Sequence, residues 1–396
     1  MKDAETTTQK DRGTRREEVL TAPLPKTGWH TVTLGELCEC IDYGFTASAD
    51  LSLKEPRFLR ITDIQNGLVN WDAVPGCKIR NDEAEQHQLR DGDIVFARTG
   101  ATTGKSLLIR SPPPAVFASY LIRLRLKPQC DAEFLSMYLQ SENYWKQIRA
   151  KARGGIQPSF NATMLRVLSV LLPPVSEQRR IAARLKEQFA AVEQARAWAQ
   201  EQSNQLHDLI AGALRDSLTG PSEAFSAEAI LEEVTAGIGS RWREFPVIGA
   251  TREGWAPAKE PVGKNPERYK LVEPGMVFYN PMRIMIGSIA TVTRPEQVGV
   301  TSPDYVVVKP KPERLNSLWF YEWLRSEYGR RFITSLARGA VRERMMFNRL
   351  RKGILDVPAL AAQERFAEIC HTARETQTGI AEQLAALDAL PAALLR

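Results

Sequence analysis

The sequence predicts an α+β protein in which two similar modules each lead into one long helix. Three observations support this prediction. The second half of the 396-residue chain repeats the first at a nearly constant offset, each half combines short β-rich runs with a helical stretch, and each half ends in an Ala-rich segment with heptad spacing. The expected architecture is a pseudo-two-fold internal repeat in which two long antiparallel helices form a coiled coil and separate two tandem modules.

The internal repeat is clearest at an offset of 185 residues, where the two halves align over a long stretch without a gap. An offset of 183 also places Gly92 on Gly275 and Gly104 on Gly287. A shared pattern of this length indicates two copies of one structural unit. The identical pairs at 185 include Tyr120 with Tyr305, Leu139 with Leu324, Ser141 with Ser326, Gly154 with Gly339, Pro173 with Pro358, and Gln178 with Gln363.

The stretch GATTGKS, at residues 100–106, is similar to a phosphate-binding loop. A Walker A loop needs four residues between its first glycine and the Gly-Lys pair, but only three separate Gly100 from Gly104. Short apolar runs on both sides predict strand, loop and strand instead of strand, loop and helix. In the second half the residue that aligns with Lys105 is Ser288, so a phosphate cradle would not be kept. We predict a hairpin whose tip varies on a repeated scaffold, which is typical of a recognition surface.

Both modules are expected to contain several short strands and one helix. That helix is predicted over residues 132–148 in the first module and 317–336 in the second. The predicted strands are 58–64, 93–98 and 120–126 in the first module, and 276–279, 288–292 and 305–309 in the second. The predicted boundaries are a disordered leader over 1–27, a first module over 28–175, a first long helix over 176–218, a second module over 219–357 and a second long helix over 358–396.

The two Ala-rich segments place apolar residues at alternating spacings of four and three, the pattern of a coiled-coil seam. The register is the same in both segments after the offset of 185. Pro391 lies inside the second segment, and because an interior proline costs a helix about 3 kcal/mol, this helix is expected to kink or end near Leu390. The seam residues predicted to face the other helix are Ile181, Leu185, Val192, Leu206 and Leu209 in the first segment, and Phe366, Ile380, Leu384 and Leu387 in the second.

Composition limits the classes of function. Apolar residues make up 43% of the chain, but no apolar run is long enough to span a membrane. Five cysteines without a CxxC pair favour a reducing cytoplasm, and four scattered histidines argue against a metal site or a His-based catalytic centre. Residues 241–352 carry 21 Lys and Arg against 11 Asp and Glu, which indicates a polyanionic partner.

Each module carries its own set of short motifs. The first has FLRITDI at 58–64 and DGDIVFARTG at 91–100, followed by LPP at 172–174 and EQRRI at 177–181, and the second has YKLVEPG at 269–275, YNPM at 279–282 and SPDY at 302–305. Through these motifs, their order, their duplication and the two helices, the sequence resembles the DNA-specificity (S) subunits of type I restriction–modification systems. The resemblance covers nearly all of the chain after residue 28.

The resemblance implies that the modules are target-recognition domains, each of which reads one half of a bipartite target in double-stranded DNA. The helices would set the gap between the half-sites and dock two methyltransferase subunits. The resemblance also implies that this chain has no catalysis of its own and binds no cofactor directly. S-adenosylmethionine and ATP would be used by the methyltransferase subunits and by motor-nuclease subunits. Such a complex works in the cytoplasm, away from membranes, in defence against foreign DNA.

Motifs of the catalytic partners are missing from the sequence. An adenine methyltransferase needs an Asp/Asn-Pro-Pro-Tyr/Phe site for the flipped base, but the prolines here occur as SPPPAV, LPPV and YNPM. A nuclease of the PD…(D/E)xK kind needs an acidic residue two positions before its lysine, and Pro303-Asp304 leads only into Val307-Val308-Lys309. The alternative function is therefore also non-enzymatic, a coiled-coil adaptor whose basic module binds protein or RNA.

Candidate DNA contacts follow from the chemistry of base edges and phosphates. Arg and Lys can pair with guanine and Asn and Gln with adenine, whereas contacts to phosphate only position the protein. The candidates are Arg60, Arg98, Thr99, Lys105 and Gln157 in the first module, and Arg241, Arg243, Arg252, Asn280, Arg283, Arg342 and Arg344 in the second.

Overall fold

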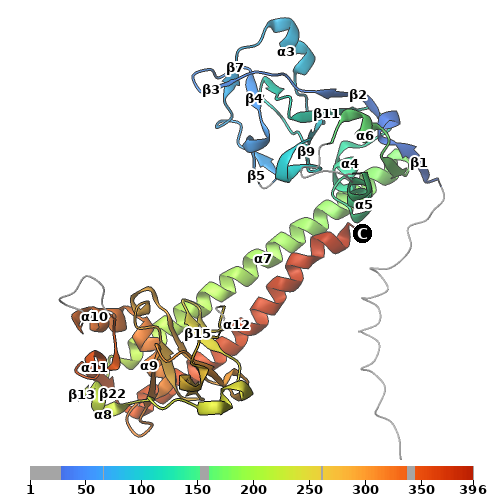
Figure 1. Cartoon of the computed structure of the whole chain (residues 1–396). Helices are drawn as coiled ribbons and strands as arrows, with labels where there is room; N and C mark the ends of the chain where they lie inside the picture. Colours follow the sequence, from blue (N-terminus) through green and yellow to red (C-terminus); the bar gives the residue numbers. More distant parts are fainter. Residues whose placement is uncertain (1–27, 66, 152–159, 260–261, 337–343, 396) are drawn as a thin grey trace, which may run out of the picture. The chain divides into compact units, whose positions relative to one another are not determined.

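The computed structural model describes residues 28–395 except for 66, 152–159, 260–261 and 337–343 (Figure 1). The expected leader, residues 1–27, lies outside this described part. The chain divides into two compact units, one made of Met1–Ala195 with Leu387–Arg396 and the other of Arg196–Ala386. No helix among the described residues is long and apolar enough to cross a membrane.

The first unit is built around an antiparallel sheet with the strand order β2-β11-β8-β9. The four residues of β8 are all buried, which is typical of a strand that is covered on both faces. Outside this sheet, β1 (His30–Thr33) pairs with β12 (Ser169–Leu172), the strand that leads into the long helix α7. The sheet strands are β2 (Cys38–Tyr43), β11 (Leu121–Leu126), β8 (Ile94–Ala97) and β9 (Ser106–Leu108).

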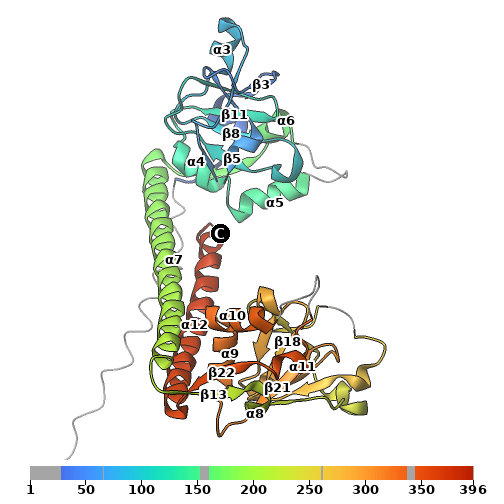
Figure 2. The ribbon, with the colours of Figure 1, turned by 90° about the vertical axis from the view of Figure 1, so that its left-hand side faces the viewer.

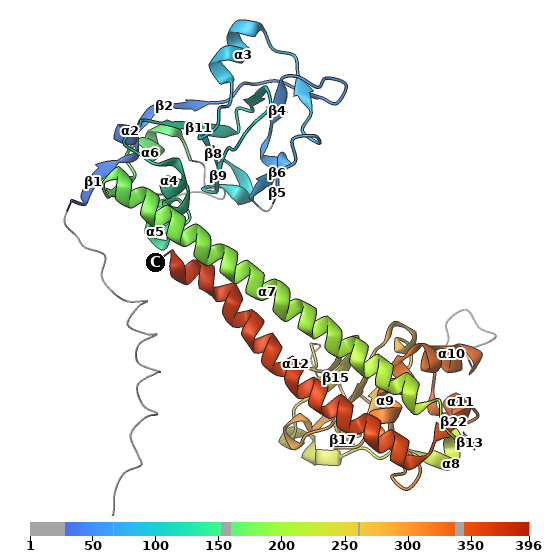
Figure 3. The same ribbon diagram turned by 180° about the vertical axis from the view of Figure 1, so that it is seen from behind.

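A second, smaller sheet of the first unit has the order β10-β4-β7-β3, and β5 pairs with β6. Helices α4 and α6 lie beside the start of α7 (Figure 3), where Leu135, Leu165 and Ala182 belong to one buried cluster. The remaining elements are β3 (Ala49–Asp50), β4 (Arg57–Leu59), β5 (Ile64–Gln65), β6 (Leu68–Val69), β7 (Gly76–Cys77), β10 (Ala115–Phe117), α2 (Leu34–Leu37), α3 (Asn81–His87), α4 (Ala132–Tyr138), α5 (Glu142–Lys151) and α6 (Ala162–Arg166).

The second unit repeats the central sheet and the outer strand pair of the first unit, but among the described residues it does not repeat the smaller four-stranded sheet. Its central antiparallel sheet has the order β14-β21-β18-β19, and β13 pairs with β22 as β1 pairs with β12 (Figure 2). The internal repeat therefore corresponds to a repeated strand order. The strands are β13 (Ser222–Ser226), β14 (Leu231–Glu233), β15 (Ile248–Thr251), β16 (Gly254–Pro257), β17 (Lys270–Val272), β18 (Val277–Tyr279), β19 (Ile289–Thr291), β20 (Gly299–Thr301), β21 (Val306–Pro310) and β22 (Ile354–Pro358), and the helices are α8 (Ala227–Ile230), α9 (Ser317–Arg325), α10 (Glu327–Leu336) and α11 (Phe347–Leu350).

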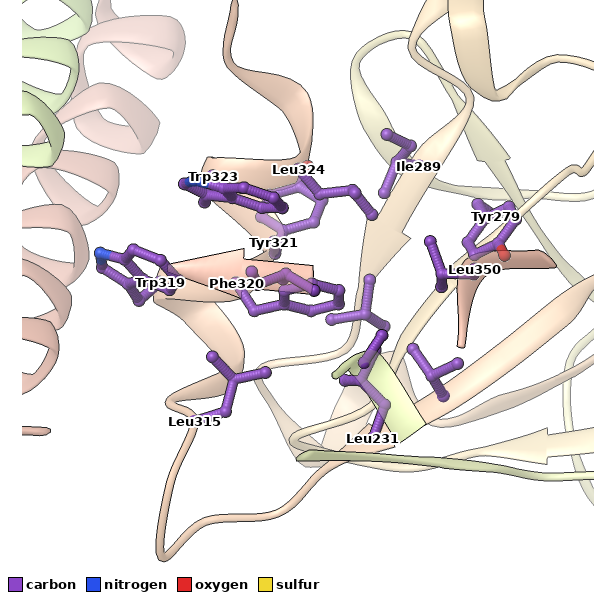
Figure 4. Packing of buried hydrophobic residues seen from close by; sticks show 14 of the residues in the cluster. Leu231, Tyr279, Ile289, Leu315, Trp319, Phe320, Tyr321, Trp323, Leu324 and Leu350 are labelled. Atoms are coloured by element: carbon purple, nitrogen blue, oxygen red, sulfur yellow. The ribbon is translucent and has the colours of Figure 1, made fainter. Parts of the chain in front are cut away.

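Aromatic residues of α9 fill the core of the second unit (Figure 4). Trp319 and Phe320 are fully buried, and the Trp319 and Trp323 rings stack with their centroids 6.0 Å apart. The indole N–H of Trp319 donates to the hydroxyl of Ser217 on α7 over 2.8 Å, so this large side chain is buried with its polar atom satisfied. Helix α9 thereby joins the sheet of the second unit to the C-terminal part of α7.

The single helix predicted in each module is in fact two helices, which corrects the sequence prediction. In the first unit α4 ends at Tyr138 and α5 begins at Glu142, and in the second unit only Ser326 separates α9 from α10. The hydroxyl of Ser141 accepts the N–H of Tyr144, and that of Ser326 accepts the N–H of Gly329. A serine that caps free N–H groups favours a new helix start, and the repeat carries such a serine at the same position twice.

Two long helices follow the modules, α7 (Val175–Ser217) and α12 (Leu360–Leu394). Within the second unit they run antiparallel and side by side, and the His207 ring on α7 lies 3.3 Å from the side-chain amide of Gln377 on α12. On α12 the predicted seam residues Phe366 and Ile380 are buried, and Leu384 and Leu387 are half-buried. On α7, Val192 is buried, and Ile181, Leu185 and Leu206 are half-buried.

Leu209 is half exposed and lines a cavity together with Phe366 and Ile369 of α12, whereas Ile210 and Leu214 pack into the core of the second unit. One detail of these helices differs from the prediction. Helix α12 does not end near Leu390 but continues through Pro391 to Leu394, because a proline in the last turn removes only one of the helix's hydrogen bonds.

A buried glutamine makes the same three hydrogen bonds at the start of each long helix. The carbonyl oxygen of the Gln178 side chain accepts the N–H of Asp131 over 2.7 Å, and its amide donates to the carbonyls of Gln129 and Pro173. Gln363 makes the three equivalent bonds, each with a partner 185 residues further along the chain. Its partners are Asn316 at 2.8 Å, Arg314 at 3.0 Å and Pro358 at 2.8 Å. The repeat thus extends to individual hydrogen bonds.

Candidate nucleic-acid interface

A β-hairpin of the central sheet occupies the same place in both units. In the first unit it is β8–β9, and in the second it is β18–β19. Both hairpins begin after a glycine with positive φ, Gly92 and Gly275, and both tips end in one, Gly104 at +91° and Gly287 at +87°. The stretch GATTGKS is therefore the tip of a strand–loop–strand hairpin, and the phosphate-loop interpretation is excluded for it.

The hairpin tip of the first unit is polar. Arg98 stacks over the ring of Tyr43, with its Cζ 4.9 Å from the ring centroid, and it donates weakly to the carbonyl of Ser119. Thr99 precedes the 3-10 turn Gly100–Thr102, and Lys105 is exposed on the far side of that turn. The structure therefore brings Arg98, Thr99 and Lys105 together at one tip. The candidate Gln157 lies in 152–159, outside the described residues.

Arg60 differs from the other candidates because its guanidinium already has a partner. Its Nε and Nη2 donate to the two carboxylate oxygens of Asp63 at 2.9 and 2.7 Å, and the same carboxylate accepts the backbone N–H of Arg60. The hydrogen bonds that Arg60 donates to Asp63 raise the pKa of Arg60. A bidentate pair of this kind competes with bidentate binding to guanine. The R-I-T-D order would have shown this pairing at a spacing of three.

The hairpin tip of the second unit is held by a dense set of hydrogen bonds. The side-chain oxygen of Asn280 accepts the N–H of Met282 at 2.9 Å, so this candidate shapes the loop. Met345 donates its backbone N–H to the carbonyl of Pro281 at 2.9 Å, which brings the neighbouring candidate Arg344 to the same loop. Arg342 lies in 337–343, which the structure leaves undescribed.

Four exposed arginines surround this second tip. Arg252 and Arg330 line a cavity of about 330 Å³ beside the 3-10 turn η5 (Ile284–Ile286), and Arg283 and Arg344 belong to the tip and its neighbouring segment. Within the described ranges, none of the four forms an ion pair, although Glu253 interacts electrostatically with Arg252. Arginines free of an ion pair attract phosphate. Arg330 was not among the predicted candidates, because only the fold brings α10 next to the hairpin.

The candidates Arg241 and Arg243 lie on a separate element, the 3-10 segment η3 (Gly239–Glu244), which packs against η4 (Pro266–Arg268). Arg241 pairs with Glu244 at 3.1 Å, and Arg243 stacks on Trp242 with its Cζ 5.1 Å from the ring centroid. These two arginines are exposed, but they are not part of the cluster at the hairpin tip.

A chain of contacts joins the second tip to α12. Arg325 on α9 donates to the carbonyl of Arg252 at 2.7 Å and to the hydroxyl of Tyr321. One turn earlier on α9, Glu322 forms a largely buried ion pair with Arg374 of α12, and Arg374 also lies over the Tyr321 ring. The position of α12 and the position of the hairpin tip are therefore linked through one helix.

The cysteines have no feature of a catalytic nucleophile. Burial raises the pKa of the Cys38, Cys130 and Cys370 thiols to about 12, so these side chains are protonated at neutral pH. In the described part of the chain, no three His, Cys, Asp or Glu side chains come together as a metal site would require.

Comparisons with known proteins agree with this architecture. Residues 26–197 match the model of a family described as the type I restriction modification DNA specificity domain. The specificity subunit of the type I restriction enzyme StySPI from Salmonella potsdam is 26% identical over 230 residues, which are 53% of this chain and 49% of the relative. That of EcoKI from Escherichia coli K12 is 26% identical over 198 residues, 45% of this chain and 42% of the relative. The chain thus spans about half the length of the curated relatives it matches.

Solved structures extend the likeness to both units. A chain from a study of the assembly and conformational transition of the type I R-M system superposes with a TM-score of 0.62 at 19% identity, over 94% of this chain and 98% of that chain. The HsdS subunit from Thermoanaerobacter tengcongensis gives 0.57 at 18%, over 95% and 97%. The chain shares the fold of these solved structures, and the fold class predicted from the sequence is confirmed. The chain is thus similar to type I DNA-specificity subunits, and residues 26–197 match their specificity domain.

Proposed function

We propose that this protein is the sequence-specific DNA-binding subunit of a type I restriction–modification complex, with each module reading one half of a bipartite double-stranded target. The observation that carries the proposal is the repeated hairpin. One scaffold presents a threonine-rich tip in the first unit and an arginine-flanked, apolar tip in the second. Two half-sites of different sequence require this combination of a constant frame and variable tips.

The charge of the second unit supports a DNA partner. Arginines at the tip that form no ion pair with a described carboxylate, such as Arg283 and Arg344, can hold phosphates or pair with guanine in the major groove. The alternative, an adaptor that binds protein or RNA, finds no support among the relatives and solved structures.

The long helices would set the gap between the half-sites and dock two methyltransferase subunits. Helix α7 has 43 residues, and at 1.5 Å per residue it is about 64 Å long, more than a compact module needs for its own core. In this proposal the chain performs no chemistry and binds no cofactor. Its partners use S-adenosylmethionine and ATP, and the complex acts in the cytoplasm against foreign DNA.

The proposal is tested by sequencing modified bases in host DNA after this chain is expressed with its methyltransferase subunit. The expected pattern is one bipartite motif with a fixed gap, which disappears when this chain is omitted. The purified chain alone is expected to turn over neither S-adenosylmethionine nor ATP. The chain with Lys105→Ala is likewise expected to turn over neither. Methylation without a bipartite motif, or turnover that Lys105→Ala abolishes, would contradict the proposal.

Arg283→Ala tests whether the modules read DNA separately. If Arg283 pairs with a guanine, its loss is expected to reduce binding by about 1–3 kcal/mol and to relax specificity at one position of one half-site. If it holds only a phosphate, binding weakens evenly across sequences and the salt slope falls by about one. The measurement is a competition profile with randomised half-sites on the assembled complex.

The matched control is Arg331→Ala, because Arg331 is exposed on α10 and its guanidinium already pairs with Glu327. In both outcomes for Arg283 the half-site read by the first module is expected to be unchanged. Equal changes in both half-sites, or no change in either half-site together with an unchanged affinity, would show that residues 281–286 are not a reading loop.

A further inference from the structure

Three apolar side chains at the second hairpin tip point into solvent. Met282 is 61% exposed, Met285 47% and Ile286 68%, whereas Ile284 between them is buried and anchors the tip in the core. We call Met282, Met285 and Ile286 the apolar tip. Exposed apolar groups that lie together on a folded surface usually mark a binding site.

The exposure of the apolar tip is imposed by a rigid loop. The N–H groups of Arg283, Ile286 and Gly287 donate to the carbonyls of Asn280, Arg283 and Ile284 at 3.0 to 3.1 Å. Gly287 closes the turn with φ at +87°, a conformation that other residues rarely adopt. The loop therefore cannot fold its apolar side chains back into the core without breaking several hydrogen bonds.

The charges around the apolar tip indicate what it binds. Arg252, Arg283, Arg330 and Arg344 flank it, and among the described residues none of the four forms an ion pair, although Glu253 interacts electrostatically with Arg252. A protein partner that covered the apolar tip would have to desolvate these unpaired charges, which is unfavourable. Duplex DNA suits both features, because its phosphates lie outside and its stacked bases lie inside.

The first unit lacks this feature. Its tip carries Thr99, Thr102 and Thr103 between Arg98 and Gly104, and it has no Met or Ile. A small polar tip can hydrogen-bond to base edges, but it cannot replace the stacking contacts of a base pair. The two half-sites should therefore be treated differently by the protein.

We infer that the apolar tip of the second unit inserts as a wedge between two base pairs of its half-site and partly unstacks them. Met and Ile are side chains that serve as such wedges, and neighbouring arginines hold the kinked backbone. Pyrimidine–purine steps unstack most easily, so the half-site is expected to contain a TA or CA/TG step at the point of insertion. This inference rests on the proposed function, because it requires that the second module bind duplex DNA.

The test uses the complex assembled with the methyltransferase subunit and duplexes with 2-aminopurine, whose fluorescence rises when it unstacks. The probe is placed at each purine position of the half-site except the methylated adenine, since a methyltransferase flips that base itself. With the natural chain, fluorescence is expected to rise at one step. The double variant Met285→Ser with Ile286→Ser is expected to lose most of this rise, and Ile286→Leu to keep it.

Affinity and a matched control complete the design. The double variant is expected to lose less than about tenfold in affinity for the specific site. The lost apolar contact weakens binding, but the energy cost of unstacking the base pairs is lost with it. Ile354→Ser is the control, since Ile354 on β22 is 69% exposed but pairs with Ser226 on β13 rather than with the hairpin. This control is expected to keep the full fluorescence rise.

The outcomes separate the inference from the proposed function. If the complex binds its bipartite site but no probe responds, or the response survives the double variant, the wedge is wrong and the proposed function stands. If the double variant instead fails to assemble with the methyltransferase subunit in size-exclusion chromatography, the apolar tip is a protein-docking site and the wedge is also wrong. If the natural complex prefers no sequence, the proposed function itself fails.

Discussion

A second copy of residues 206–209 inserted into α7 is expected to lengthen the gap between the two half-sites by about one or two base pairs, because four residues add about 6 Å of helix and one base pair spans about 3.4 Å. Sites with the natural gap should lose methylation almost completely. Both half-site sequences should stay as they were, since the insertion leaves both hairpins unchanged. Sequencing of modified bases in the host DNA measures all three results at once.

The rotation that accompanies an insertion provides the control. Four residues turn a helix by about 400°, so the buried face returns to within about 40° of its original direction. Two inserted residues turn it by about 200°, which would move the contact of His207 with Gln377 to the opposite side of α7. The two-residue variant is therefore expected to abolish methylation at every gap. An unchanged gap in the four-residue variant would show that α7 does not act as a ruler.

The internal repeat carried most of the fold prediction, because both copies had to satisfy the same geometry. Gly104 and Gly287 mark left-handed turns, and Gln178 and Gln363 make matching buried hydrogen bonds, so their recurrence in the sequence reflected real constraints. The breaks between the paired helices also have a signal in the repeat, because Ser141 and Ser326 occupy the same position in the two halves. Helical periodicity on both sides concealed their role as caps.

The candidate interface was less predictable, because it depends on contacts between segments far apart in the chain. Arg330 reaches the second tip only through the packing of α10, and Arg60 is engaged by Asp63. The exposure of Met285 and Ile286 was also hidden, since apolar residues next to a strand usually indicate core.

Arg374→Met is expected to lower the free energy of unfolding of the second unit by about 2–3 kcal/mol. The variant would leave the carboxylate of Glu322, whose side chain is 17% exposed, without its counter-charge, and an unpaired charge in that position is strongly destabilising. Arg374 itself is 32% exposed, which places the expected effect at the lower end for broken ion pairs. Thermal unfolding of the purified chain measures the change as an earlier transition.

The matched control is Arg331→Met, which breaks the Arg331–Glu327 pair on α10. Both partners of that pair are more than two-thirds exposed, at 75% and 67%, so its loss is expected to cost about 0–1 kcal/mol. Equal effects of Arg374→Met and Arg331→Met would show that the ion pair between α9 and α12 contributes no more to the free energy of unfolding than an exposed pair does.

The same ion pair should also influence DNA reading, because α9 connects α12 to the hairpin. Glu322 and Arg325 lie one turn apart, and Arg325 holds the carbonyl of Arg252 beside the second tip. Arg374→Met is therefore expected to reduce selectivity at the half-site of the second module and to leave the other half-site unchanged.

The double variant Glu322→Met with Arg374→Met removes both charges and should restore most of the stability, since an apolar pair of similar volume often replaces a buried ion pair without loss. If the double variant is stable but its selectivity stays low, the charges position the tip. If stability and selectivity return together, packing between α9 and α12 is sufficient, and the charges have no separate role in reading DNA.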